Sequence, residues 1–332
     1  NGTQVGTELS VCTTKDCWLP RTALAGWRVQ IPDQIQSINT DGTELISIAQ
    51  IDGISWQLNR ASQSLALSVS DAKFTGTARD LSATSAAPLD AAPLGSFLNY
   101  SLNYLHAPGE NQSSAYFEWG VFGRLGVFTS TAVLSSIRGF ERLDSTWTFD
   151  RPETMQTISV GDNISDGGQW GRSRRFGGLQ WRSNFAVRPD LVTFPLPGAS
   201  GSSAVPASVD IYVDEVLRSR TEVPAGPFEF NNLPVTTGSG EVEMVVRDAY
   251  GREQRVRLDY FVSPQLLNPG LRAFEYSIGL QRRGYGDQTD YQDVIAVVTE
   301  RRGLSNRLTG EWHSEITRDQ VRSGFGAIVL GS

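Results

Sequence analysis

The feature that most constrains the fold is a compact unit that interrupts a regular series of alternating segments. Residues 178–185 alternate apolar and polar side chains, and the same alternation resumes at residues 272–281. Period-two alternation predicts β-strands. Residues 205–262, between them, have the pattern of a separate all-β unit. Proline-bearing connectors flank this unit at residues 188–198 and 263–270.

The chain of 332 residues contains two cysteines, Cys12 and Cys17. A metal site would need about four ligands, and the two histidines, His106 and His313, lie far away in the sequence. A redox pair usually has two intervening residues rather than four. The spacing therefore favours a disulfide that closes a hairpin, and hence an oxidising compartment. The alternative is two free or buried thiols.

Charge and motifs exclude several classes of function. The net charge is −7 and no basic block stands out, which argues against a general nucleic-acid binder. No apolar run approaches the roughly 18 residues of a membrane helix, although strands of about 9–11 residues can also cross a bilayer. Neither histidine lies near a nucleophile motif, and no phosphate-binding loop is present. We therefore expect no catalytic residues, no metal, no cofactor and no nucleotide.

The first part of the chain predicts a small β-rich domain over residues 1–80, with short apolar runs separated by turn signals. Residues 20–29 can form a short helix that ends near Gly26. Residues 81–95 are rich in Ala, Ser and Pro and almost uncharged, a composition typical of a linker.

From residue 96 onward, alternating segments predict ten strands, six before the inserted unit and four after it. An ordinary soluble sandwich also alternates, so periodicity alone does not decide the architecture. Short links fall at every second joint and longer polar links fall between them, which is typical of an outer-membrane barrel. The predicted strands cover residues 96–104, 115–121, 127–136, 143–150, 154–161, 175–185, 272–282, 294–301, 307–315 and 324–330.

The inserted unit, residues 201–264, predicts a small β-sandwich. Its strands turn at Asp214 and Glu215 and again around Tyr250 and Gly251. A domain of this size is about 25 Å across, too wide for the lumen of a ten-stranded barrel. We therefore predict a partial barrel, formed by residues 96–200 and 265–332, that belongs to a longer protein.

Several runs resemble the outer-membrane ushers of chaperone–usher pilus assembly, in particular the archaic branch associated with spore-coat-U-like subunits. The resemblance covers nearly the whole chain and is strongest between residues 161 and 284. It rests on GLQWRSNFAVRPDLVTFPLPG, VPASVDIYV, GPFEFNNLP, GSGEVEMVVRDAYGREQ and SPQLLNPGL.

The resemblance implies an all-β fold: a partial antiparallel transmembrane β-barrel, an inserted β-sandwich plug domain and a small N-terminal periplasmic domain. Residues 1–80 would receive complexes of a periplasmic chaperone with pilin subunits. Residues 204–262 would close the idle pore, and the strand pair 154–185 would help to hold this plug. The implied location is the bacterial outer membrane, with outer-membrane lipid as a partner and a homodimer as a possible assembly. The residues that contact the chaperone stay unassigned, because the family's extreme N-terminal tail would precede this sequence.

Two sets of residues are candidates for plug control. Arginines before the plug can bind acidic residues of the plug, or can simply be solvated. Trp181, beside Arg182, can line the gate or can face lipid, and for Trp181 we favour the lipid-facing position. The connectors can be hinges, or stiff struts with motion at their glycines. The plug-holding candidates are Arg172, Arg174, Arg175, Arg182, Asp210, Asp214 and Glu215. The connector candidates are Pro195, Pro197, Gly198, Pro264, Pro269 and Gly270.

Two other classes of protein remain open from the sequence. A plugged small-solute transporter usually carries its plug at the N-terminus, whereas here the compact unit interrupts the strand series. A soluble multi-sandwich adhesin or carbohydrate-active protein would be favoured if the full-length protein were soluble without detergent. We favour the usher interpretation over both.

Overall fold

The computed structural model describes residues 6–8, 10–13, 15–40, 42–82, 92–285 and 290–331. Most of the linker predicted at residues 81–95 lies outside them. The chain forms two compact units, which we call the two-segment unit (residues 1–83 and 196–262) and the wall unit (residues 84–195 and 263–332). Across the described ranges, no helix combines the length and apolar character that crossing a bilayer requires.

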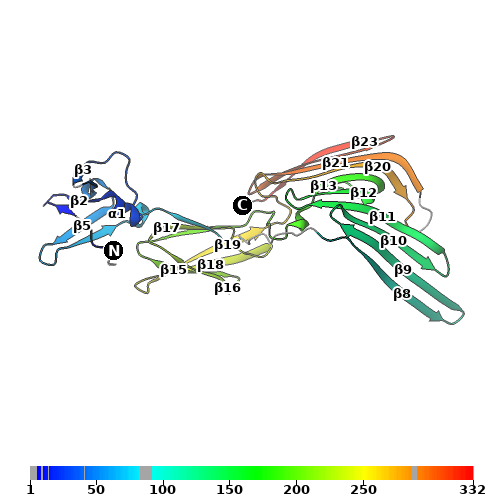
Figure 1. The fold of residues 1–332 in the computed structure, drawn as a ribbon, viewed down its shortest axis with the longest axis horizontal. Helices are drawn as coiled ribbons and strands as arrows, with labels where there is room; N and C mark the ends of the chain where they lie inside the picture. Colours follow the sequence, from blue (N-terminus) through cyan, green and yellow to red (C-terminus); the bar gives the residue numbers. More distant parts are fainter. Residues whose placement is uncertain are drawn as a thin grey trace. The chain divides into compact units, whose positions relative to one another are not determined.

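The wall unit is one ten-stranded antiparallel sheet in which almost every strand pairs with its neighbours in sequence. The exception is β13, which pairs with β20 and so brackets the inserted segment. Figure 1 shows the strands following one another as a bent wall from β8 to β23, the two edge strands of the described sheet. The strands are β8 (Gly95–Ala107), β9 (Glu110–Gly123), β10 (Gly126–Ser135), β11 (Gly139–Arg151), β12 (Gln156–Ile164), β13 (Arg175–Ser183), β20 (Arg272–Arg283), β21 (Asp290–Ser305), β22 (Leu308–Thr317) and β23 (Val321–Val329).

These ten strands confirm the number and order expected from the alternation. The structure extends most of them by a few residues, because backbone pairing continues past the last alternating side chain. The fold class is likewise confirmed: the chain is almost entirely β, with a large antiparallel sheet and a small N-terminal domain.

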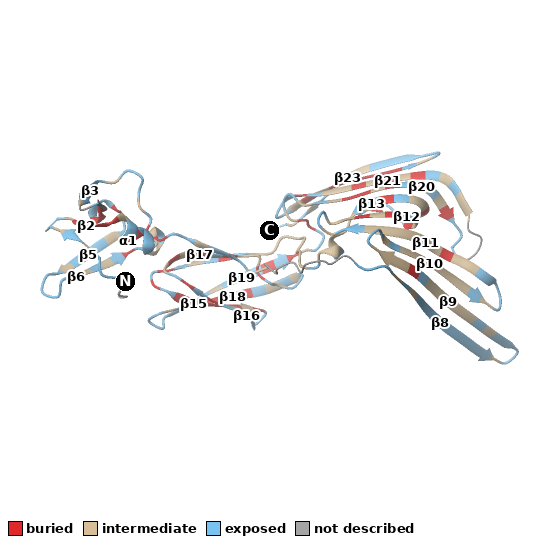
Figure 2. Ribbon diagram, in the orientation of Figure 1, coloured by how far each residue is buried: buried red, intermediate tan, exposed pale blue. Residues whose placement is uncertain are grey.

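The sheet has an apolar face and a polar face, as period-two alternation requires. On the apolar face, Leu102 is 67% exposed and Trp119 is 47% exposed, and no second sheet among the described residues covers them. Phe274 is buried, but by aromatic rings of its own sheet, since its ring lies 5.0 Å from that of Trp181 and 5.3 Å from that of Tyr276. Most large side chains on this face are therefore exposed to the surrounding medium and do not form the core of a sandwich (Figure 2).

Aromatic residues gather on the apolar face near the rim that carries the short turns. They form contacting groups along the strands, and Trp181, one of the alternatives for a gate residue, belongs to this band rather than to the polar face. Such a band is typical of a membrane interface. Its members are Trp119, Phe128, Trp147, Phe149, Trp181, Phe274, Tyr276, Trp312 and Phe325.

In the two-segment unit, the N-terminal part contains a four-stranded sheet, a two-stranded hairpin and the predicted short helix, α1 (Arg21–Gly26). Buried Leu24, Ile46 and Ile48 pack in its core. The strands of the sheet are β1 (Val11–Cys12), β2 (Cys17–Pro20), β4 (Thr43–Ser47) and β3 (Ser37–Thr40), and the hairpin is β5 (Ile54–Asn59) with β6 (Ser64–Val69). Single-turn 3-10 helices occupy Ile48–Gln50 and Asp71–Lys73.

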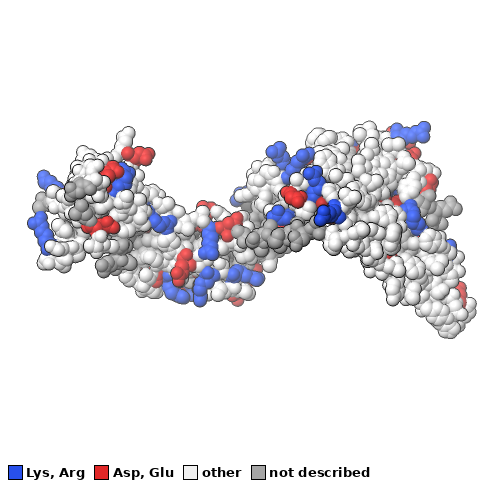
Figure 3. Space-filling model, in the orientation of Figure 1, with Lys and Arg blue, Asp and Glu red and all other residues white. Residues whose placement is uncertain are grey.

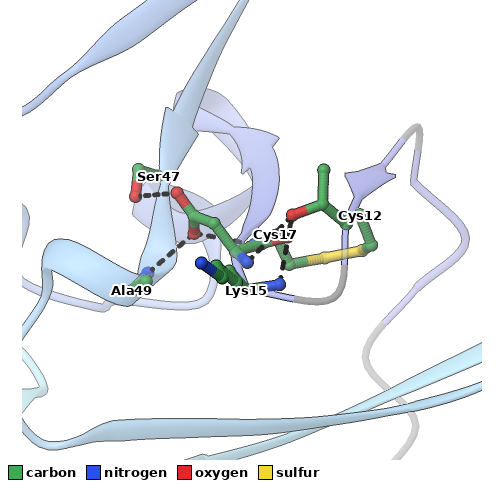
Figure 4. Close-up of a disulfide and its surroundings, with 7 residues drawn as sticks. Cys12, Lys15, Cys17, Ser47 and Ala49 are labelled. Carbon is green, nitrogen blue, oxygen red and sulfur yellow. Dashed lines mark hydrogen bonds between the residues drawn. A yellow bond between two sulfur atoms is a disulfide. The ribbon is translucent and has the colours of Figure 1, made fainter.

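Cys12 and Cys17 form the predicted disulfide at the end of the β1–β2 hairpin (Figure 4). The neighbouring Asp16 carboxylate accepts hydrogen bonds from the Ser47 hydroxyl (2.5 Å) and from the backbone N–H of Ala49 (3.2 Å). The cross-linked turn is therefore also fixed to the sheet behind it.

The insert, residues 196–262 of the two-segment unit, is the predicted β-sandwich. One layer is β16 (Val216–Val223), β15 (Ala207–Val213), β18 (Gly238–Asp248) and β19 (Glu253–Val262). The other contains β14 (Ala199–Ser203) and β17 (Gly226–Asn231). The layers touch at Gly201, where a Cβ atom would lie 2.7 Å from the Phe228 ring and 3.3 Å from the terminal methyl of Met244.

A third strand of the second layer comes from outside the insert. β7 (Thr77–Asp80), at the end of the N-terminal part, pairs in parallel with β17. The sequence pattern did not predict this pairing, since it places residues 1–80 and the insert in different domains. The boundary between these parts is therefore bridged by a shared sheet.

Candidate functional site

The insert leaves the wall after β13 and returns before β20 through two connectors that bind each other. Asn268 donates from its backbone N–H to the Thr193 carbonyl and from its side-chain amide to the Val192 carbonyl, both at 2.8 Å. Gly270 has φ +82°, a conformation that favours glycine, and its N–H donates to the Gly303 carbonyl (2.9 Å). The return connector is thus fastened to the wall.

The outgoing connector changes units within a few residues. It contains a 3-10 helix at Phe185–Val187, and Pro195 is the last residue of the wall unit before the insert. The carbonyl of Pro197 already accepts a hydrogen bond from the N–H of Leu233 in the insert (2.9 Å). The change of unit therefore falls between these two prolines, where a hinge would have to lie.

The segment between β12 and β13, residues 165–174, lies across the polar face of the wall. The backbone N–H of Asp166 donates to Glu275 on β20 (2.9 Å), and that of Gln169 donates to Glu311 on β22 (2.8 Å). The Arg174 guanidinium pairs with Glu315, also on β22 (2.7 Å). We call residues 165–174 the crossing segment.

Three buried carboxylates hold the crossing segment. Glu275, Glu311 and Glu315 are each no more than 5% exposed. A buried carboxylate is costly unless hydrogen bonds or opposite charges satisfy it. Here backbone N–H groups and arginines do so, including Arg301, whose Nε lies 3.2 Å from Glu311.

A ring contact also fixes the crossing segment to the edge strand of the wall. Trp170 packs on two glycines of β23: a Cβ at Gly326 would lie 2.0 Å from the indole, and one at Gly324 would lie 2.9 Å from its nitrogen. Both positions need the absence of a side chain. The segment therefore reaches from β12 across to β23 on one face.

A second polar group lies near the long-loop ends of the strands. Arg282 is 1% exposed at its side chain and pairs with Asp144 (2.7 Å) and with Asp162 (3.1 Å). Arg142 also pairs with Asp162, and its guanidinium donates to the Tyr291 hydroxyl (2.8 Å). These pairs join four strands, β11, β12, β20 and β21, and so brace the wall at that rim.

Comparison with known proteins matches this arrangement to one family. The sequence model of the family described as "Outer membrane usher protein" matches residues 156–317, the region that holds the crossing segment, the insert and the strands β20 to β22. The chain belongs to the outer membrane usher family.

Curated relatives are ushers or related anchoring proteins. The chain is 32% identical over 127 residues to the outer membrane usher protein FanD of Escherichia coli, covering 38% of this chain and 15% of that protein. It is 33% identical over 116 residues to the F1 capsule-anchoring protein of Yersinia pestis, covering 34% and 13%. The chain thus matches well under two thirds of the length of these relatives.

One solved structure also matches part of this chain. In the cryo-EM structure of the E. coli P pilus tip assembly intermediate PapC-PapD-PapK-PapG, the match has a TM-score of 0.49 and 19% sequence identity. It covers 85% of this chain and 36% of the other.

Two of the four predicted plug-holding arginines have ion-pair partners within the wall. Arg174 pairs with Glu315, and Arg175 lies 3.5 Å from Asp144. Arg172 and Arg182 are exposed. A grip of these arginines on the insert stays a prediction.

The predicted acids of the insert have local roles. Asp210 is 3% exposed and receives two hydrogen bonds from Arg220, at 2.6 and 2.8 Å. Asp214 and Glu215 form the tight turn between β15 and β16, with φ of +49° and +66°. Asp214 also accepts from the backbone N–H of Glu241 (3.1 Å). These contacts account for the acids as elements of the insert's own fold.

The carboxylates that hold the crossing segment were not among the predicted site residues. Glu275 alternates with Phe274 and Tyr276, so the sequence places it on the polar face, but acids are common there. A useful signal would have been three acids on that face of β20 and β22 opposite a glycine-rich loop. The identity of their partners depends on how that loop folds back, which periodicity does not encode.

Proposed function

We propose that this chain is part of an outer-membrane usher that receives chaperone–pilin complexes and passes pilus subunits outward through a pore that the insert gates. The observation that carries the proposal is that the insert, a compact domain, interrupts the chain between two strands of the wall, β13 and β20, that pair with each other. Membership of the usher family, and a wall with one apolar face and one polar face, support the same function. The process is protein translocation and assembly rather than catalysis.

The insert fits the role of a plug because its surface is suited to water. Its sheet β16-β15-β18-β19 carries cross-strand ion pairs, among them Arg247 with Glu253 (2.5 Å) and Arg257 with Glu243 (3.2 Å). A charged surface of this kind is expensive against lipid and suits a hydrated lumen or the periplasm. Entry from the short-turn rim follows from the strand ends at β13 and β20.

The N-terminal part fits the role of a receiving domain on the periplasmic side. It has its own core, and its disulfide suits an oxidising compartment.

Translocation would be directional because a strand added to an incomplete pilin sheet stabilises the folded product. PapC is solved in an assembly intermediate with PapD, PapK and PapG, and we extend partners of that kind, a chaperone and pilus subunits, to this chain. Contact with lipid and assembly as a homodimer belong to the same proposal.

The gating claim is tested by deleting residues 204–262 from the full-length usher. Because the insert would block the lumen, the deletion variant should show a higher single-channel conductance in planar bilayers than the intact protein. The intact protein is the control, and heat-modifiable gel mobility should show that the deletion variant is folded to the same extent. An unchanged conductance would remove the gating role of the insert.

A further inference from the structure

Two arginines stand directly opposite each other on the apolar face of the wall. Arg272 on β20 and Arg302 on β21 are Cα partners in the antiparallel register. Like charges directly opposite each other destabilise a strand pair. The two strands place one carboxylate, Glu300, on this face near the short-turn rim.

Glu300 is already engaged by one of the two arginines. The Arg272 Nε donates to Glu300 (2.8 Å), and another guanidinium nitrogen donates to the Tyr276 hydroxyl (2.6 Å). The guanidinium also lies over the Phe274 ring, 4.9 Å from its centroid. Arg272 is thus held in one orientation while its side chain stays 53% exposed.

Arg302 is left with excess charge. It is exposed, and it forms no ion pair within the part of the chain that the structure describes. With two arginines and one carboxylate, the group of Arg272, Arg302 and Glu300 carries a net charge of +1. An anion from outside the chain would relieve the repulsion between the two guanidinium groups.

The surroundings indicate where that anion comes from. Arg272 and Arg302 lie beside the aromatic band, between Trp181 on β13 and Trp312 on β22, whose Cα partner is Glu300. Figure 3 shows Lys and Arg side chains gathered at the end of the ten-stranded sheet near the chain's C-terminus, while the surface over β9 and β10 is almost free of charge. A basic site next to an aromatic band is placed at the depth of lipid headgroups.

We propose that Arg272 and Arg302 bind the phosphate of an anionic glycerophospholipid in the leaflet at the short-turn rim. Guanidinium groups match phosphate oxygens with paired hydrogen bonds. Glu300 and Tyr276 orient Arg272. The neighbouring indoles of Trp181 and Trp312 contact the acyl chains close to the headgroup. The inference rests on the proposed outer-membrane function.

The test compares lipid retention by the full-length usher and its variants. The proteins are reconstituted in vesicles of equal parts phosphatidylglycerol and phosphatidylethanolamine, extracted gently, and their bound lipids are counted by native mass spectrometry. Arg302→Gln should lower the ratio of retained phosphatidylglycerol to phosphatidylethanolamine about fivefold, the value expected for one arginine at the membrane surface. Arg302→Lys should restore much of the ratio because it restores the charge.

Arg318→Gln is the matched control, since it removes an exposed arginine from the loop after β22 at the opposite rim. An unchanged ratio in Arg302→Gln, or an equal loss in Arg318→Gln, would overturn the site. With lipopolysaccharide added to the vesicles, an Arg302-dependent retention of lipopolysaccharide instead would overturn the phospholipid assignment. If the intact protein did not float with the vesicles, the outer-membrane function would fall and the site with it. Flotation with an unaltered ratio would remove the site alone.

Discussion

Asp210 shows how a single residue of the insert is kept charged inside a sheet. The two hydrogen bonds from Arg220 lower the pKa of Asp210 below its ordinary value, against burial, which raises it. The carboxylate is nearly inaccessible, whereas Arg220 is 63% exposed at its side chain. The pair therefore links β15 to β16 through a carboxylate that is largely shielded from water.

This pair predicts a pH dependence of the insert's stability. Because the pKa of Asp210 is lower in the folded than in the unfolded state, its contribution is complete above the unfolded value of about 4 and is lost as the pH falls through the folded value. Amide hydrogen exchange of β15 peptides, corrected for intrinsic rates, should therefore speed up below about pH 4. In Asp210→Asn that acid-dependent increase should shrink. Asp259→Asn, which changes an exposed acid on β19, is the control and should behave like the unmodified protein.

Glu311 is the residue on which the crossing segment most depends. Its carboxylate serves both the Gln169 N–H and Arg301, and its side chain is 1% exposed. In Glu311→Ala the Gln169 N–H loses its acceptor and the Arg301 guanidinium loses its carboxylate partner, which costs about 1.5–3 kcal/mol. Peptides from residues 165–174 should then exchange their amide hydrogens at least about tenfold faster. Asp319→Ala, on the exposed loop after β22, should leave the exchange unchanged, and equal rates in the two variants would contradict the anchoring role.

At the scale of elements, β7 is the clearest case of a strand that belongs to two parts of the chain. Its backbone pairs with β17, and the Asn232 side-chain amide donates to Asp80 at its end (2.8 Å). Just before it, Phe74 lies so close to Gly226 that a Cβ there would be 2.5 Å from the Phe74 Cβ. Gly226 also has φ +121°, so this approach requires glycine.

The register of β7 and β17 predicts a specific cross-link. Ala78 and Glu229 are Cα partners, so Ala78→Cys with Glu229→Cys should form a disulfide in the full-length usher under mild oxidation. Ala78→Cys with Glu222→Cys, on β16 of the other layer, should not. Peptide mapping under non-reducing conditions measures both yields. Equal yields would show that β7 does not occupy this position.

Elements defined by local pattern were predictable from the sequence. The ten wall strands follow from alternation, and the Asp214–Glu215 turn follows from two strands separated by a short polar pair. The Cys12–Cys17 disulfide followed from spacing. In each case the residues that set the structure are neighbours in sequence.

Elements defined by distant partners were not predictable. The strand Thr77–Asp80 is short and polar, and its pairing depends on an open edge of the insert far along the chain. Arg174 similarly finds Glu315 only because the crossing segment folds back over the polar face. Alternation fixes which face a residue takes, but not which loop comes to cover that face.

At the scale of the whole molecule, the proposed function requires the wall to separate two media. Its apolar face carries large exposed side chains and an aromatic band, and its polar face carries buried carboxylates beneath the crossing segment. An open or closed pore, the proposed lipid site and the gating insert all require this division. A wall with water on both faces could serve none of them.

The most direct test is a cysteine scan along β8 in the full-length usher in vesicles. Leu98, Tyr100 and Leu102 lie on the apolar face, and Asn99, Ser101 and Asn103 lie on the polar face. Single cysteines at the first three positions should resist a water-soluble maleimide, and their attached fluorophores should be quenched by spin-labelled lipid. Cysteines at the other three positions should react readily and escape the quencher. Uniform reactivity along the strand, with no alternation in quenching, would contradict the membrane wall.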